Sequence, residues 1–289
     1  MLSMRIYLTA FYFAIITVSG VSANPITFAP VKVQPGESIR LVASSNAANG
    51  TITKWIGAEP RSGQIDMSRD KELHWTFRAP EADGTRRGMV KAVRLSSSET
   101  LKIGGQEEKS EYVSTLTGKL FTMTKPPVGE WEFKLDGAAL GVDGRKDINE
   151  LKSYLKRQWF PDHPVKTGDS WEFDPAWIKS VIERDLGDAL TIGTMTLSEV
   201  RKSTTRSTAT IGITIRSSGE GFQKDGSLSE ASVDLKGKMV VNLETMLDES
   251  LELEGTVTKT TRETKDTTKV TLPVRIVVTK SLFKAGGAP

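Results

Sequence analysis

Residues 233–243 read VDLKGKMVVNL, and apolar and polar residues alternate along almost all of this stretch. Because successive side chains of a β-strand point to opposite faces, this period of two predicts a strand with one buried and one exposed face. The stretch also belongs to a repeat, since LKGK at 235–238 followed by LELEG at 251–255 is similar to LTGK at 116–119 followed by FKLDG at 133–137, which begins 119 residues earlier. The repeat predicts a duplicated β-hairpin and two related antiparallel meanders.

Alternation of the same kind recurs on both sides of the repeat. Leu116, Gly118 and Leu120 are expected on one face of a strand. Asn49 and Gly50 predict a tight turn between two strands of the first meander. Pro273 cannot donate to a neighbouring strand, so its own strand is expected at a sheet edge, where it would close the border of the sheet, or at a bulge. Further strands are predicted over residues 38–43, 51–56, 63–67, 72–78, 88–95, 209–216, 251–257 and 270–278.

In the middle of the chain the spacing of the apolar residues changes from that of a strand to that of a helix. Apolar residues recur at helical spacing after Asp147, and again between Pro175 and Gly187, which predicts two short helices. The fold class is therefore all-β dominated with a small α insertion, and the two meanders form one curved sheet, arranged as a half-barrel or a sandwich. The expected divisions are a signal peptide at 1–23, the N-terminal meander at 24–144, the helical insertion at 145–188, the C-terminal meander at 189–283 and a flexible tail at 284–289.

The first 23 residues have the three parts of a secretory signal peptide. Arg5 supplies a positive charge, residues 6–18 are an apolar segment, and Val21, Ser22 and Ala23 form a small-residue cleavage site. An uncleaved membrane anchor is the alternative, but 13 apolar residues are fewer than the roughly 20 that a membrane-spanning helix needs. The chain is therefore predicted to be exported to the periplasm or the extracellular space and not to be an integral membrane protein after cleavage.

Composition excludes several classes of protein. The chain has no cysteine, which rules out disulfides, thiolate metal sites and a lipid-modified N-terminal cysteine. Its formal net charge is only +3, and Lys and Arg are scattered among Asp and Glu without clustering near aromatic residues. Nucleic-acid binding is therefore not expected.

The segment between the predicted helices is rich in Trp and Pro. Trp159, Phe160 and Trp171 are expected to anchor this loop to an apolar surface, because aromatic side chains bury large areas. Residues 164–171, PVKTGDSW, resemble a P-V-K-x-G-D-x-W string found in a family of uncharacterised exported bacterial β-rich proteins. The resemblance covers about residues 95–278 and implies an envelope or secreted protein without a defined activity.

The layout also resembles the lipoprotein-carrier half-barrel fold, in which helices partly cover the concave side of a curved antiparallel sheet. If the resemblance holds, it implies a cavity for an acyl chain or another apolar ligand. The alternative is that the apolar sheet faces form an ordinary core without a cavity, because a sheet face must be covered in either case. The ligand-binding residues predicted on this basis are Trp131, Phe133, Leu135, Leu251 and Leu253.

Catalytic and metal-binding patterns are weak. His163, Asp169 and Ser170 share one loop, but the chain has no G-x-S-x-G motif to support a serine nucleophile. Residues 143–150 loosely suggest a calcium loop, but Arg145 stands at a ligand position and Ile148 at the glycine position. No catalytic residue, metal site or cofactor is predicted, and the protein is not expected to be an enzyme.

Three function classes remain, and the third, an enzyme whose carboxylates only the fold would bring together, is not favoured because the sequence shows no catalytic constellation. The first is non-enzymatic binding of an apolar small molecule or lipid, which the broad one-sided sheet favours. The second is a structural or protein-interaction module of the envelope that contacts another protein through an exposed strand near Pro273.

Overall fold

The computed structural model describes residues 24–29, 31–34, 36–135, 159–172, 190–222, 227–263 and 266–284. Within them the chain forms strands joined by turns, and no segment forms a helix long and apolar enough to cross a membrane. The two predicted mid-chain helices lie outside the described residues. The strands are β1 (Glu37–Ile56), β2 (Glu59–Phe77), β3 (Arg86–Ile103), β4 (Gln106–Val113), β5 (Leu120–Lys125), β6 (Glu132–Leu135), β7 (Ser170–Glu172), β8 (Leu190–Arg201), β9 (Thr208–Phe222), β10 (Leu228–Asn242), β11 (Asp248–Arg262) and β12 (Asp266–Lys284).

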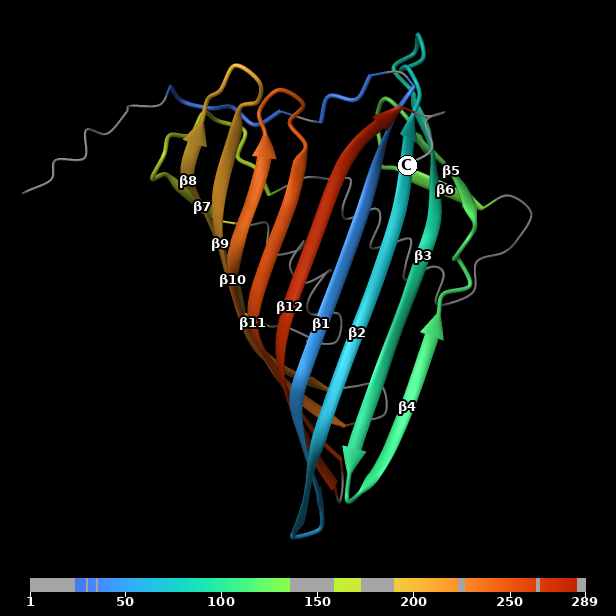
Figure 1. The fold of residues 1–289 in the computed structure, drawn as a ribbon, viewed down its shortest axis with the longest axis vertical. Helices are drawn as coiled ribbons and strands as arrows, with labels where there is room; N and C mark the ends of the chain where they lie inside the picture. Colours follow the sequence, from blue (N-terminus) through green and yellow to red (C-terminus); the bar gives the residue numbers. More distant parts are fainter. Residues whose placement is uncertain are drawn as a thin grey trace, which may run out of the picture.

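All twelve strands belong to one open antiparallel sheet, which confirms the predicted all-β class. The strand order is β6-β5-β3-β2-β1-β12-β11-β10-β9-β8-β7, and β4 pairs with β3 beside this path. Figure 1 shows the sheet as a curved layer with β1 and β12 in its middle. The sandwich alternative is wrong, because the described strands form a single sheet.

The first and last strands join the two meanders. β1 pairs with β12 from Glu37 opposite Lys284 to Ile56 opposite Asp266. β12 also pairs with β11 on its other side, so it lies in the interior of the sheet. The expectation that the Pro273 strand forms a border is therefore wrong.

The bulge expected as the alternative for Pro273 is present. The register of β1 against β12 shifts between Ala47 and Thr51, opposite the segment that contains Pro273. Asn49 has a φ of 59° in this bulge, and its backbone N–H donates to Asp66 Oδ1 at 2.7 Å. Asn49 and Gly50 therefore form a β-bulge inside one long strand. The predicted turn between two short strands is wrong, because a residue in the left-handed conformation can form a bulge as well as a hairpin turn.

The first copy of the repeat does not form the predicted strand. Leu116 and Gly118 lie in a turn in which Gly118 has a φ of 80°, a left-handed conformation that ends an extended segment. Leu116 is buried but Leu120, at the start of β5, is exposed, so these residues do not share a face. The strand begins after the turn, with Phe121 and Met123 as its buried residues.

The second copy forms the predicted hairpin. β10 and β11 pair with Leu235 opposite Gly255 and Gly237 opposite Leu253. Gly237 is required by the close approach of the strands, because a Cβ atom there would lie 1.8 Å from the backbone oxygen of Glu252. The alternation read from residues 233–243 thus predicts both the strand and its buried face.

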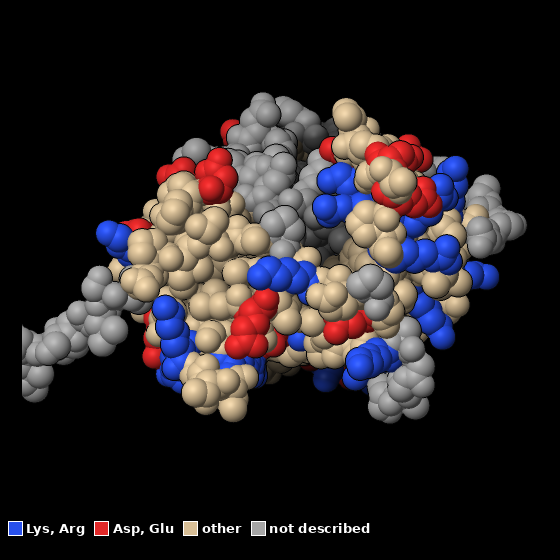
Figure 2. Space-filling model, turned by 90° about the horizontal axis from the view of Figure 1, so that it is seen from above, with Lys and Arg blue, Asp and Glu red and all other residues tan. Residues whose placement is uncertain are grey.

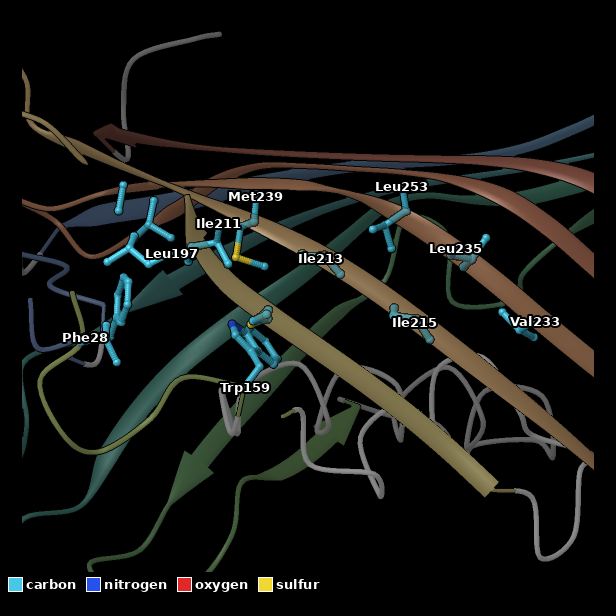
Figure 3. Packing of buried hydrophobic residues seen from close by; sticks show 14 residues of the cluster. Phe28, Trp159, Leu197, Ile211, Ile213, Ile215, Val233, Leu235, Met239 and Leu253 are labelled. Carbon is cyan, nitrogen blue, oxygen red and sulfur yellow. The ribbon is translucent and has the colours of Figure 1, made fainter. Parts of the chain in front are cut away.

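Two apolar clusters pack on the same face of the sheet, which we call the inner face. The first cluster covers β8 to β11 and includes Leu197, Ile211, Met239 and the aromatic residues Phe28 and Trp159 (Figure 3). The second cluster covers β1 to β3 with β5 and consists of Ile39, Leu41, Leu73, Trp75, Val90, Ala92, Leu95, Leu116, Phe121, Met123, Leu247 and Val278. Leu251 and Ile276 pack against both clusters and connect them.

Candidate functional site

A trough of about 670 Å³ lies on the inner face, next to the region where the two apolar clusters meet. Its lining comes from β1 to β4 on one side and from β10 to β12 on the other. Ala47, near the middle of β1, lies between these two sides. The sheet therefore curves enough for strands from both meanders to border one space.

One wall of the trough is apolar and is formed by β10 to β12. Its side chains are Leu235, Val257, Leu272, Val274 and Ile276. Of these, only Leu235 is fully buried, and the other four keep part of their surface accessible. Branched apolar side chains that border an open space provide contact area for an apolar group.

The opposite wall is polar and is formed by β1 to β4. Its inward-facing polar residues are Ser45, Arg69, Ser97, Glu99, Ser110 and Tyr112. The inner side of β3 changes from Val90 and Ala92 to Ser97 and Glu99 along the strand. The polar character thus starts where the second cluster ends.

A buried ion pair lies beyond the trough, within the second cluster. Lys280 Nζ donates to Asp248 Oδ2, and their side chains are only 3% and 4% exposed. Lys280 stands opposite Leu41 in the β1–β12 register, so the charge lies among apolar neighbours. A pair of this kind connects the start of β11 to the end of β12, because separating two buried charges is costly.

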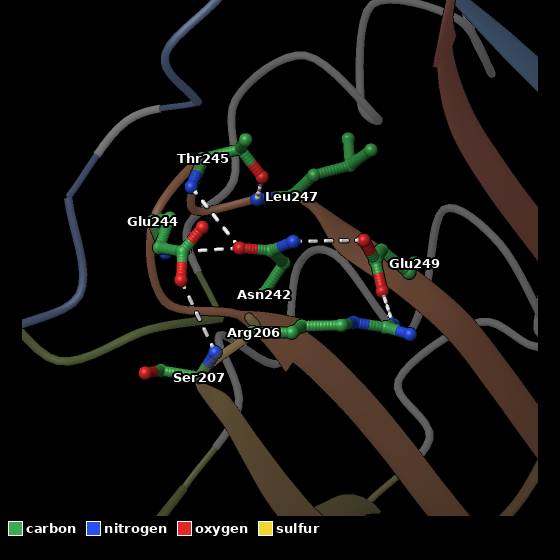
Figure 4. Close-up of polar contacts among 7 residues, drawn as sticks. All are labelled: Arg206, Ser207, Asn242, Glu244, Thr245, Leu247 and Glu249. Atoms are coloured by element: carbon green, nitrogen blue, oxygen red, sulfur yellow. Dashed lines mark hydrogen bonds and ion pairs between the residues drawn. The ribbon is translucent and has the colours of Figure 1, made fainter. Parts of the chain in front are cut away.

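The turn between β10 and β11 holds Leu247 and Glu249, the residues on either side of Asp248, in place (Figure 4). Asn242 Oδ1 accepts hydrogen bonds from the backbone N–H groups of Glu244 and Thr245 at 2.9 and 3.2 Å. Asn242 Nδ2 donates to Glu249 Oε1 at 3.0 Å, and Glu249 also accepts from Arg206. Met246 has a φ of 58° in this turn, which lets the chain reverse before the buried Leu247.

A second hollow, of about 650 Å³, lies on the outer face. Its side chains are mainly threonines and charged residues, namely Thr194, Thr196, Thr214, Lys236, Lys238, Glu252, Glu254 and Arg275. Lys236 stands opposite Glu254, and Lys238 stands opposite Glu252. The two faces therefore differ, since only the inner trough combines an apolar wall with a polar one.

The predicted ligand-binding residues belong to the two apolar clusters or pack against them. Trp131, Phe133 and Leu135 are partly buried against the second cluster, and Trp131 meets Phe77 edge-on with ring centroids 6.3 Å apart. Leu251 packs against both clusters, and Leu253 is buried in the first. None of these five side chains lines the trough, so a contact between them and a ligand stays a prediction.

The trough residues were missed at the sequence level, although a signal was present. The strand predicted at 88–95 ended before Ser97 and Glu99, because the serine run at 96–98 interrupts the apolar alternation. A change from apolar to polar residues on one face of a continuing strand would have indicated a wall of this kind.

The three predicted loop anchors contact one another and the first cluster. Phe160 stacks on Phe28 with ring centroids 4.5 Å apart. Trp171 Nε1 donates to the backbone oxygen of Trp159 at 2.8 Å, and Trp159 is buried. Ile26 and Val165 form an isolated antiparallel bridge, which ties the N-terminal segment to this loop. The loop and the N-terminal segment thus cover the first cluster together.

The geometry does not assemble the residues weighed for catalysis. Ser170 Oγ lies 2.8 Å from Thr196 Oγ1, while His163 Nδ1 lies 3.5 Å from Asp162 Oδ1 on an exposed loop. Asp169 accepts a hydrogen bond from the backbone N–H of Lys166 at 2.8 Å. Among the described residues, no three His, Cys, Asp or Glu side chains form a group that could hold a metal ion.

Glu72, on β2, has a carboxyl group whose pKa departs from its ordinary value. Burial acts to raise its pKa, but hydrogen bonds from Arg40 and His74 outweigh burial, so the pKa lies below its ordinary value. Arg40 Nε donates to Glu72 Oε1 at 2.9 Å, and His74 Nε2 lies 3.1 Å from the same oxygen. This cluster is on the outer face and does not border the trough.

Charges are mixed elsewhere on the surface. Figure 2 shows basic and acidic side chains interspersed on the face seen from above. Arg87, which follows Arg86 in the sequence, forms an ion pair with Glu81, with an Nε to Oε1 distance of 2.6 Å.

Comparisons with known proteins give only distant likenesses. No family model matches the chain, and no curated protein matches it. A structure that describes lipid–protein interactions in lipovitellin aligns with a TM-score of 0.40 and 10% identity, over 89% of this chain and 26% of that one. The chain thus spans about a quarter of that protein's length. The crystal structure of Pseudomonas aeruginosa OccK7 (OpdD) aligns with a TM-score of 0.28 and 8% identity, over 86% of this chain and 100% of that one. Both TM-scores lie below 0.5, so neither likeness carries an argument about function.

Proposed function

We propose that this protein binds an apolar or amphipathic small molecule, a lipid in the first instance, in the trough on the inner face of its sheet. The observation that carries the proposal is the apolar wall, where Val257, Val274 and Ile276 border an open space of about 670 Å³. Ligand pockets commonly have volumes of roughly 300–1,000 Å³ and are lined mostly by apolar side chains. Burial of this wall by a ligand is favourable because it removes apolar surface from water.

The protein performs this role outside the cytoplasm and without catalysis. The signal peptide predicted at residues 1–23 supports export to the periplasm or beyond. The separate hydrogen-bond partners of Ser170 and His163 support a binding role over a hydrolytic one.

The interaction-module alternative is less well supported. The Pro273 strand that was expected to offer an edge is interior, since β12 pairs with both β1 and β11. The exposed edge strand β4 carries Glu107, Glu108, Lys109 and Glu111. Charged residues on an edge strand discourage pairing with another chain, so β4 is a poor site for strand addition.

The experiment is native mass spectrometry of the chain purified from its own host, with organic extraction of the same sample. A co-purifying apolar compound at near-stoichiometric amount is expected, and the same compound should be absent from a variant with a filled trough. Val274→Trp is suited to filling it, because the neighbours of Val274 on the adjacent strands are Ala47 and Gly255. Both neighbours are small, so the indole can enter the trough.

The matched control is Val277→Trp, since Val277 stands opposite Ser44 and Glu252 on the outer face of the same strand. The control should retain the compound. An empty wild-type protein that also fails to take up added palmitate would contradict the proposal.

A further inference from the structure

A β-bulge brings two basic residues of β3 to the same face of the sheet. The register of β3 against β2 shifts between Ala92 and Arg94, which makes Val93 an additional residue on β3. In a regular strand, residues three positions apart point to opposite faces. Because of the bulge, Lys91 and Arg94 both lie on the outer face, where both are exposed. Bulges of this kind often redirect a side chain at a functional site.

A third cation lies on the same part of the outer face. Arg40, on β1, stands opposite His74, and His74 stands opposite Lys91. Arg94 lies in the next row, opposite Glu72. Arg40 and Lys91 are thus separated by two strand spacings, or roughly 10 Å at the backbone. Two side chains of this length can reach one anion placed between them.

The Glu72 carboxylate orients Arg40 without using all of its donors. Its side chain is only 13% exposed, and its Oε1 accepts a hydrogen bond from Arg40 Nε at 2.9 Å. No described residue accepts a hydrogen bond from the two terminal amino groups of Arg40. Lys91 and Arg94 form no ion pair with a carboxylate of the described residues. These three side chains therefore have donors available to a ligand.

Positive charge is in excess on this part of the face. In the two adjoining rows, the outward residues of β1, β2, β3 and β12 are Ser38, Thr76, Met89 and Phe283 on one side and Ser44, Asp70, Ser96 and Val277 on the other. Asp70 is the one charged residue among these eight. Three cations thus stand against two carboxylates, Glu72 and Asp70, which leaves one positive charge in excess when His74 is neutral.

We propose that Arg40, Lys91 and Arg94 bind a phosphate group on the outer face of β1 to β3. A guanidinium can donate two parallel hydrogen bonds to phosphate oxygens, and a lysine ammonium adds a mobile positive charge. Glu72 acts as a positioning residue, because it holds the Nε of Arg40. The site lies on the face opposite to the trough, so it is independent of the ligand proposed there.

The test follows the two histidines of the chain by NMR while inorganic phosphate is added at constant pH and constant ionic strength. His74 lies between Arg40 and Lys91, so its imidazole signals should shift saturably. His163 is on an exposed loop and provides a reference within the same molecule, whose signals should stay unchanged. The titration of His74 gives the dissociation constant.

Arg94→Gln should raise this dissociation constant about fivefold, the size of effect that an exposed charged contact gives. The matched control is Arg216→Gln, because Arg216 lies on the outer face of β9 and faces Asp234, with an Nε to Oδ2 distance of 3.6 Å. The control should keep the wild-type constant. Circular dichroism melting curves show whether both variants are folded.

A second arm distinguishes a free phosphate from the phosphate of a lipid head group. It measures sedimentation of the protein with phosphatidylcholine vesicles that contain or lack phosphatidic acid. Sedimentation that needs phosphatidic acid and is reduced by Arg94→Gln supports a lipid head group as the source. A His74 shift without sedimentation supports a soluble phosphate.

Three results would overturn the site. They are the absence of a saturable His74 shift in the folded wild-type protein, equal shifts of both histidines, and an affinity for phosphate that Arg94→Gln leaves unchanged.

Discussion

Two parts of the same inner face, a few residues apart along the same strands, have opposite character. Near the start of β1, Leu41 stands opposite Leu73 and both are almost fully buried in the second cluster. Further along these strands, Ser45 stands opposite Arg69, which is exposed and lines the trough. The pairing of β1 with β2 is continuous through both parts. The register of β3 against β2 shifts between the two parts, and β3 changes its other partner from β5 to β4. Stability and ligand binding should therefore be separable by mutation along one strand.

The largest effect is expected from the buried ion pair in the sealed part. Lys280→Met should lower the free energy of unfolding by about 3–5 kcal/mol, because it removes the cation that donates to the buried Asp248 carboxylate. Chemical denaturation measures this change. The double variant Lys280→Met with Asp248→Leu should recover much of the loss, and Lys269→Met, at an exposed position, should have little effect. A single variant as stable as the wild type would show that the pair does not hold β11 to β12.

The next largest effect is the difference in stability loss between a substitution in the buried part of β1 and one in the part that lines the trough. Leu41→Ala should cost about 2–5 kcal/mol of unfolding free energy, because it removes a fully buried side chain and leaves a cavity. Ser45→Ala, four residues along the same face, should change stability by less than about 0.5 kcal/mol. Equal losses in urea denaturation would mean that the trough is as tightly packed as the core.

A smaller loss is expected where the apolar wall depends on close strand approach. Gly237→Ala should destabilise the protein by about 1–3 kcal/mol, since the new Cβ atom would meet the backbone oxygen of Glu252 at 1.8 Å and push β10 from β11. Gly212→Ala provides the comparison, because its Cβ atom would lie 3.1 Å from the hydroxyl oxygen of Ser198 and 3.9 Å from the backbone oxygen of Thr196. Thermal melting should rank Gly237→Ala below Gly212→Ala, and the reverse order would contradict the hairpin geometry.

The smallest effect is expected from the cluster of Arg40, Glu72 and His74 on the outer face of β1 and β2, which makes the stability depend on pH. The pKa of Glu72 is lower in the folded protein than its ordinary value of 4.5, so its contribution is present above that value and is lost as pH falls through the folded pKa. Unfolding free energies measured from pH 6 to pH 3 should therefore decline less steeply for Glu72→Gln than for the wild type. Parallel curves for the two proteins would show that the Glu72 carboxyl group does not contribute to the pH dependence of stability.

The sequence predicts well which segments form strands and which of their faces is buried, but it predicts poorly which strands pair with each other. Residues 233–243 predicted both β10 and its buried face, because each strand residue reports its own environment. The pairing of β1 with β12 joins residues more than 200 positions apart, as with Glu37 and Lys284, and no local pattern encodes it. For that reason Pro273 was assigned to a border as readily as to a bulge, and only the second assignment is correct.

The first copy of the repeat and the trough were misjudged for related reasons. The string at Leu116 matches that at Leu235, but Gly118 adopts a left-handed turn where Gly237 stays extended between two strands. Glycine permits both conformations, so the shared string did not decide between them. The polar wall around Ser97 and Glu99 looked like the end of a strand, because the serine run at 96–98 interrupts the apolar alternation although β3 continues to Ile103.

The most direct measurement of the central claim places a fluorescent reporter in the trough. The chain has no cysteine, so Ser97→Cys can be labelled with an environment-sensitive dye, and Thr100→Cys gives the matched label on the other face of β3, outside the trough lining. Titration with palmitate should shift the emission of the dye at position 97 saturably and leave the emission of the dye at position 100 unchanged. No saturable shift at position 97, or equal shifts at both positions, would contradict binding in the trough.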